Sequence, residues 1–181
     1  MHHLAYDAAE FAAFNLETGQ ISSRENEQLA LIPTDVLAAL TPNDDLNKAT
    51  RAWGETHGKR LKEVITYENA QELESLANHI GGALAVFGFG KGSVEIRGSA
   101  LLFKVQTTSR SAMSPLLPGF LGGFLTALNP EHDFEVIHLE SNDTEEILWA
   151  GNPSAVSKMK KLLEAHDNPF DALDQLAKEG N

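Results

Sequence analysis

The chain contains no cysteine. Disulfide bonds, thiolate metal ligands and thiol nucleophiles are therefore excluded. It also lacks an apolar run of the ~18–20 residues that a membrane-spanning helix needs. Its first residues, which include Asp7, do not show the basic-then-apolar pattern of a signal peptide. We therefore expect a cytoplasmic protein with no membrane span.

Basic residues are scarce as well, with 14 Lys and Arg against 26 Asp and Glu and a net charge of −12. Binding of a phosphate backbone needs clustered Lys and Arg. The densest such cluster, Lys158, Lys160 and Lys161, has the spacing of a solvated helix face. We expect no nucleic-acid partner. The length of 181 residues and the hydrophobic fraction of 42% suit one folded domain covering 1–181.

Helical spacing of apolar residues and capping residues predict a series of helices. Asn69 is the expected cap of one of them, and Asn152-Pro153 has the cap-then-proline pattern that starts another. The predicted helices are 5–16 (with a strand at its end as the alternative), 34–40, 44–66, 70–87, 115–129, 154–166 and 170–178.

Two hairpins are predicted from alternating apolar residues and turn signals. The first pairs Ser93–Arg97 with Ala100–Thr107, and the second pairs Asp133–Leu139 with Glu146–Ala150. A weaker hairpin is indicated for 16–21 and 28–32. Because hairpins pair antiparallel and the helices lie outside them, the order of elements favours an α+β fold over a doubly wound sheet.

Familiar catalytic motifs are not matched. The loop Gly88–Ser93 resembles a phosphate loop, but its lysine is followed by glycine and the order is helix then strand, the reverse of what a phosphate loop needs. Ser109 and Ser114 lack the G-x-S-x-G context of a hydrolase. We expect no enzyme.

Histidines and acidic residues give no metal site either, because no helix carries a His-x-x-x-His pair. His138 alternates with Phe134 and Val136, so a core histidine is the favoured interpretation over a ligand-contacting one. The acidic cluster near the last hairpin turn is expected to be a solvated tip. Its members are Glu140, Asp143, Glu145 and Glu146.

Glycines interrupt two of the predicted helices. Glycine inside a helix costs about 1 kcal/mol relative to alanine, so repeated glycines usually have a packing reason. The helix 115–129 is apolar nearly all round and must be buried on most sides. We expect the glycines to form an interface with another helix of this chain, a partner subunit or a ligand. They are Gly54, Gly58, Gly119, Gly122 and Gly123.

The run from Trp53 to Gly151 resembles the 4-vinyl-reductase small-molecule-binding domain of the TRAPP-subunit-like superfamily. The likeness lies in the glycine-containing long helix and the glycine break into the strand Ser93–Arg97. It also lies in the Gly119–Leu125 helix and the strand Phe134–Glu140. About 43–151 would form the core, and 152–181 would add C-terminal helices.

The resemblance implies a four-stranded antiparallel sheet packed against helices, often dimeric through helices, that binds hydrophobic molecules or acts as a scaffold. Many relatives carry cysteines after the position of Glu140, where this chain continues Ser141-Asn142-Asp143. A zinc-dependent or lipid-modified version of the fold is therefore not expected. Haem-binding relatives have a Y-x-S-x-R motif, of which only Arg110 is matched here, and His79 would have to be the axial ligand. No cofactor is expected, with haem as the least favoured alternative.

Two classes of function remain. In the first, a small hydrophobic molecule lies between the helix 115–129 and the sheet, and in the second the same surface forms a homodimer or scaffold contact with no ligand. Most of the expected ligand-contacting residues are aromatic, and His57, His138 and Arg110 would be the polar anchors. The full set is Trp53, His57, Phe87, Phe103, Arg110, Phe120, Phe124, His138 and Trp149.

Overall fold

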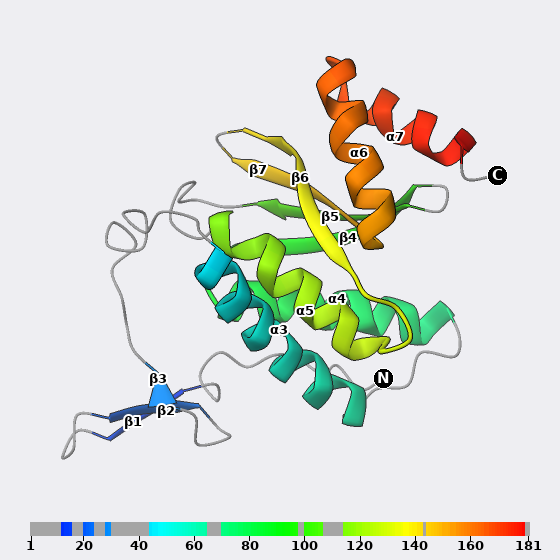
Figure 1. Cartoon of the computed structure of the whole chain (residues 1–181). Helices are drawn as coiled ribbons and strands as arrows, with labels where there is room; N and C mark the ends of the chain where they lie inside the picture. The colour runs from blue at the N-terminus through cyan, green and yellow to red at the C-terminus, as the bar shows by residue number, and fades with distance from the viewer. Residues whose placement is uncertain are drawn as a thin grey trace.

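The computed structural model describes residues 12–15, 20–23, 28–29, 44–64, 70–97, 100–106, 114–142 and 144–179. Figure 1 shows these segments as a larger sheet with helices on both sides and a separate small sheet from the N-terminal part. The predicted helix at 34–40 and the candidate anchor Arg110 lie outside the described residues.

The larger sheet has four antiparallel strands in the order β4-β5-β7-β6. They are β4 (Lys91–Arg97), β5 (Ala100–Gln106), β6 (Glu135–Ser141) and β7 (Glu145–Gly151). Arg97 pairs with Ala100 in the first hairpin, and a β-bulge interrupts the second between His138 and Glu140. The α+β class and the four-stranded antiparallel sheet are confirmed.

The helices also follow the predictions closely. They are α3 (Asp44–Val64), α4 (Ala70–Val86), α5 (Leu117–Leu128) after the 3-10 turn η1 (Ser114–Leu116), α6 (Pro153–Ala165) and α7 (Pro169–Glu179). Asn152 caps α6 as expected, because its side chain accepts a 2.8 Å hydrogen bond from the Ala155 amide. In the described part of the chain, no helix combines the length and apolarity needed to cross a membrane.

The N-terminal segments differ from one prediction. Strands β1 (Ala12–Asn15), β2 (Gln20–Ser23) and β3 (Gln28–Leu29) form a three-stranded antiparallel sheet. The expected helix is therefore wrong over 12–15, where the strand alternative is correct: each of these four residues has a cross-strand partner on β2. Of the weak hairpin predicted for 16–21 and 28–32, the described residues show the pairing of Ile21 with Leu29, while 16–19 and 30–32 lie outside them.

The large sheet is covered on both faces. Helices α3, α4 and α5 lie on one side of it, and α6 and α7 lie on the other (Figure 1). Successive strand residues point to opposite faces, so Phe103 belongs to the core under α5 and Leu102 to the core under α6 and α7. The result is a helix–sheet–helix sandwich with two separate hydrophobic cores.

Helix α5 is buried by direct contact of its backbone with α3. A Cβ atom on Gly54 would collide with the carbonyl oxygen of Phe120, and one on Gly58 would collide with that of Phe124. The two glycines lie one turn apart on α3, so that face of the helix offers no side chain to hold α5 away.

The glycines of α5 complete the same contact from the other side. A Cβ on Gly119 would collide with the hydroxyl of Thr50, and one on Gly123 would collide with the carbonyl oxygen of Arg51. Of the three partners that the sequence left open for these glycines, the structure identifies a helix of the same chain. The glycines therefore give no reason to expect a second subunit at this position.

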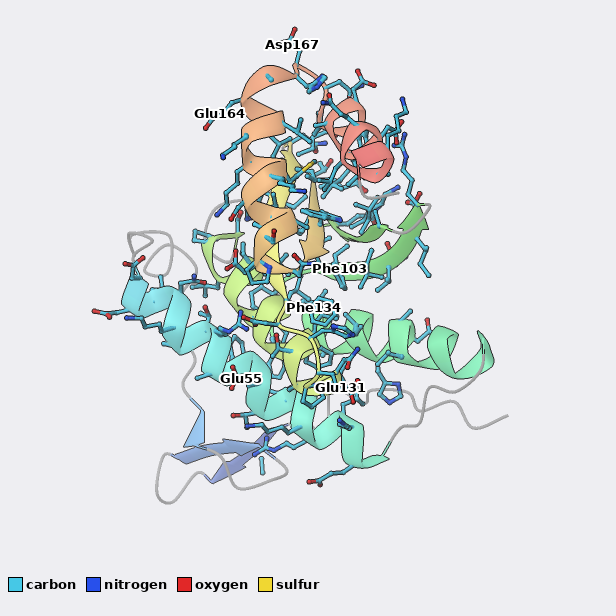
Figure 2. The ribbon with its side chains drawn as sticks, turned by 45° about the vertical axis from the view of Figure 1, so that its right-hand side comes forward. Glu55, Phe103, Glu131, Phe134, Glu164 and Asp167 are labelled. Carbon is cyan, nitrogen blue, oxygen red and sulfur yellow. The ribbon has the colours of Figure 1, made fainter. Side chains whose placement is uncertain are left out.

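Arg51 fastens this helix pair to the loop before β6. Its guanidinium donates to the Phe134 carbonyl oxygen at 2.9 Å and to the Thr126 hydroxyl at 3.1 Å, and it forms an ion pair with Asp133. Figure 2 labels Phe134 in this loop. A Cβ on Gly122 would lie 3.1 Å from the same Phe134 oxygen and 3.3 Å from the guanidinium, so this glycine leaves room for the arginine.

Replacement of Gly54 by alanine tests the backbone contact. Helix propensity alone would stabilise the variant by about 1 kcal/mol, whereas the collision with the Phe120 carbonyl is expected to destabilise it by about 2–3 kcal/mol or more. Urea denaturation followed by circular dichroism measures the difference. A gain in unfolding free energy would contradict the close α3–α5 contact.

Candidate functional site

Five of the expected ligand-contacting residues do come together, on the side of the sheet that α3, α4 and α5 cover. Trp53 of α3 lies 4.8 Å from Phe87 and 4.8 Å from Phe120, measured between ring centroids, and His57 lies 4.6 Å from Phe87. Phe124 stacks on Phe120 at 5.9 Å. We call these residues, together with Phe89, the aromatic cluster.

The aromatic cluster is tightly filled. Phe120 and Phe124 are 1% and 2% exposed, and Phe89, which lies 5.2 Å from Phe120, is 1% exposed. Trp53, His57 and Phe87 are half-buried and form its outer side. Ring separations of this size are those of directly packed aromatic pairs. The cluster is therefore a packed corner of the core whose outer edge contacts solvent.

Phe103 and Trp149 do not join this cluster at one site. Phe103, labelled in Figure 2, is fully buried in the core between the sheet and α5. Trp149 lies in the other core, under α6 and α7, because it pairs with Leu102 and shares the opposite face of the sheet with it. The predicted set of ligand-contacting residues is thus divided between two sides of the sheet.

His138 and Glu146 form a polar group that the sequence did not reveal. Glu146 is only 1% exposed, so the expectation of a solvated acidic tip is wrong for this residue. Its carboxylate accepts a 2.9 Å hydrogen bond from the hydroxyl of Ser114, and the Nδ1 atom of His138 lies 3.4 Å from the same oxygen. The pairing of Glu146 with Val105 turns its side chain towards the α5 face of the sheet, where η1 covers it.

This arrangement differs from that of a hydrolase. In a catalytic triad the histidine lies between the serine and the carboxylate, whereas Ser114 and His138 both approach one oxygen of Glu146. The geometry fits a buried carboxylate that accepts a hydrogen bond from Ser114 and lies close to His138. The role that it supports is anchoring η1 to the sheet.

Of the two residues that the haem alternative requires, the structure describes only His79. His79 is 8% exposed on α4, while Arg110 lies outside the described residues. Across the described ranges, no group of three or more His, Asp and Glu side chains is placed to hold a metal ion.

A pocket of about 470 Å³ opens beside Trp149, where β5, β7, α6 and α7 meet. Such a volume lies within the usual range for small-molecule sites, about 300–1,000 Å³. Most of its wall is apolar, and the polar side chains are Arg97, Asn152 and Asp174. Its apolar lining consists of Ala100, Leu101, Phe134, Trp149, Ala150, Gly151, Ala155, Leu173, Leu176 and Ala177.

At the rim of this pocket, a side-chain contact links β4 to α7. The Arg97 guanidinium contacts the Asp174 carboxylate at 3.2 Å and lies over the Phe170 ring at 4.9 Å from its centroid. Arg97 and Asp174 are separated by 77 positions in the chain. Sequence reasoning missed both, because no local pattern links the end of a hairpin strand to the last helix.

A second hollow lies between the C-terminal ends of α3 and α5. Its volume is about 590 Å³, and Glu55, Lys59, Lys62 and Glu63 supply much of its wall. Its wall is mostly apolar, but it is an open groove, so an apolar molecule in it would stay largely in contact with solvent.

No model of a known protein family matches this chain, and a search of curated proteins finds no similar sequence.

Replacement of Ser114 by alanine tests the buried polar group. The variant leaves the Glu146 carboxylate without this hydroxyl donor, and we expect a loss of about 1–3 kcal/mol in unfolding free energy. Ser157→Ala is the matched control, because the Ser157 hydroxyl donates to a carbonyl of its own helix at the surface. Its effect should stay within about 0.5 kcal/mol. Equal effects in urea denaturation would contradict a structural role for the Ser114–Glu146 bond.

Proposed function

We propose that the protein binds a small hydrophobic molecule in the pocket beside Trp149, without catalysing its conversion. The observation that carries the proposal is the pocket itself, with its apolar wall and few polar groups. Its described lining contains neither serine nor histidine, so no described residue there resembles a nucleophile with its base. The resemblance to the 4-vinyl-reductase domain, whose members bind hydrophobic molecules, favours the same class of function.

The pocket lies at the ends of β5 and β7, and its α6 and α7 walls are on the opposite side of the sheet from the place expected from the sequence. The interface between α5 and the sheet contains Phe103, Leu121 and Leu148, each fully buried. A ligand there would have to displace packed side chains, whereas beside Trp149 the space already exists. Binding in a preformed pocket avoids that cost.

The two tryptophans report on the two sides separately, because the chain has only Trp53 and Trp149. In the Trp53→Phe variant, titration with 1-octanol should shift the emission of Trp149 in a saturable way. In the Trp149→Phe variant, the emission of Trp53 should stay constant. A response of Trp53 alone would move the site to the aromatic cluster, and no response in either variant would contradict hydrophobic-ligand binding.

The second candidate function is self-association through strand β4. This strand lies at one edge of the sheet, so one row of its backbone groups can pair with another strand. Ile96 is the large apolar side chain that the described residues leave most exposed, at 69%. Two copies paired antiparallel about Ser93 would place Lys91 of one opposite Glu95 of the other, and Ile96 opposite Gly90. The match of charges favours a second copy of this chain as the partner.

Charge variants test this pairing by light scattering after size exclusion. Lys91→Glu and Glu95→Lys would each place like charges opposite one another, so each variant alone should be monomeric. Their equimolar mixture restores opposite charges and should give a heterodimer. A monomeric wild-type protein, or a mixture that stays monomeric, would contradict association through β4.

A further inference from the structure

Among the described residues, the lining of the pocket beside Trp149 has one cationic side chain, that of Arg97 at the rim. The guanidinium lies between α7 and the end of β4, with Asp174 and Phe170 beside it. The rest of the lining, apart from Asn152 and Asp174, is apolar. An apolar wall with a single positive group at its mouth matches a molecule that has an apolar body and one negative end.

Arg97 has more N–H donors than its contact with Asp174 uses. An arginine carries five N–H donors in a planar fork that suits a carboxylate bidentately. The described residues give this guanidinium one carboxylate contact, Nη2 to Asp174 at 3.2 Å. Its side chain is 42% exposed, so solvent and a ligand can reach the remaining donors. Its position over Phe170 limits how the guanidinium plane can turn.

The other two polar side chains of the described lining, Asn152 and Asp174, carry no positive charge. Asn152 caps α6 by accepting from the Ala155 amide. Arg97 is therefore the cationic group that the described lining offers to an anion.

We propose that the ligand is a hydrophobic carboxylic acid, bound as its carboxylate at Arg97 with its apolar part against Trp149 and Leu173. This inference rests on the proposed binding in the same pocket. The carboxylate would share the guanidinium with Asp174 or replace it. Asp174 is then a competitor for Arg97 and not a ligand contact.

A purely structural role of the ion pair between Arg97 and Asp174 predicts different effects of the two single variants. If Arg97 and Asp174 serve only to hold α7, loss of either partner breaks the same contact and both variants should behave alike. If Arg97 recognises a carboxylate, the two variants should act in opposite directions, because one removes the binding group and the other removes its competitor. The opposition of the two effects separates recognition from anchoring.

Calorimetric titration with octanoate and 1-octanol at neutral pH tests the proposal. The two probes have hydrocarbon chains of the same length, but octanoate ends in a carboxylate and 1-octanol in a neutral hydroxyl. Wild-type protein should bind octanoate about tenfold more tightly than 1-octanol, which is the usual gain from a hydrogen bond to a charged group. Arg97→Gln should abolish this preference. Asp174→Asn should increase it severalfold by strengthening the binding of octanoate. Circular dichroism checks that both variants are folded.

Equal affinities of the wild-type protein for the two probes would overturn the proposal while leaving hydrophobic-ligand binding intact. So would an Arg97→Gln variant that keeps the preference, or an Asp174→Asn variant that loses it. Absence of binding by either probe would overturn the proposed function and this inference together.

Discussion

The contact between the backbones of α3 and α5 is the constraint on which the rest of this structure depends. Glycines on both helices meet the other helix directly, so neither has room for even a methyl group at those positions. Helix α5 is thereby covered by α3 on one side and by the sheet on the other, which permits a helix that is apolar nearly all round. Arg51 then fixes the pair to the loop that leads into β6.

This contact also decides where space is left for a ligand. With α5 pressed between α3 and the sheet, the large side chains of that layer interdigitate and the aromatic cluster fills the adjoining corner. The opposite face is covered by α6 and α7, which meet at an angle (Figure 1). The pocket beside Trp149 lies where these two helices meet the ends of the strands. The α3–α5 layer provides the framework, and α6 and α7 on the other face provide much of the pocket wall.

The helices and strands can be predicted from local sequence signals, whereas the positions of the candidate site residues depend on pairing between segments far apart in the chain. Asn152-Pro153 predicts the start of α6 because a cap and a proline act within a few residues. Trp149 was assigned to the wrong face because β7 is buried on both sides, so its residues show no alternation from which to infer a face. The burial of Glu146 likewise depends on η1, which lies 32 positions earlier at Ser114.

In the proposed complex, Arg97 would bind a ligand without releasing α7, because other contacts hold most of that helix in place. An ion pair between half-exposed side chains contributes about 0–1 kcal/mol, while Ala172 and Leu173 anchor α7 by burial to 0% and 4%. Burying a leucine side chain contributes about 1.5–3 kcal/mol. Exchange of Asp174 for a ligand carboxylate therefore costs α7 little of its attachment. The helix that closes the pocket can stay in place while the charged group at its rim changes partner.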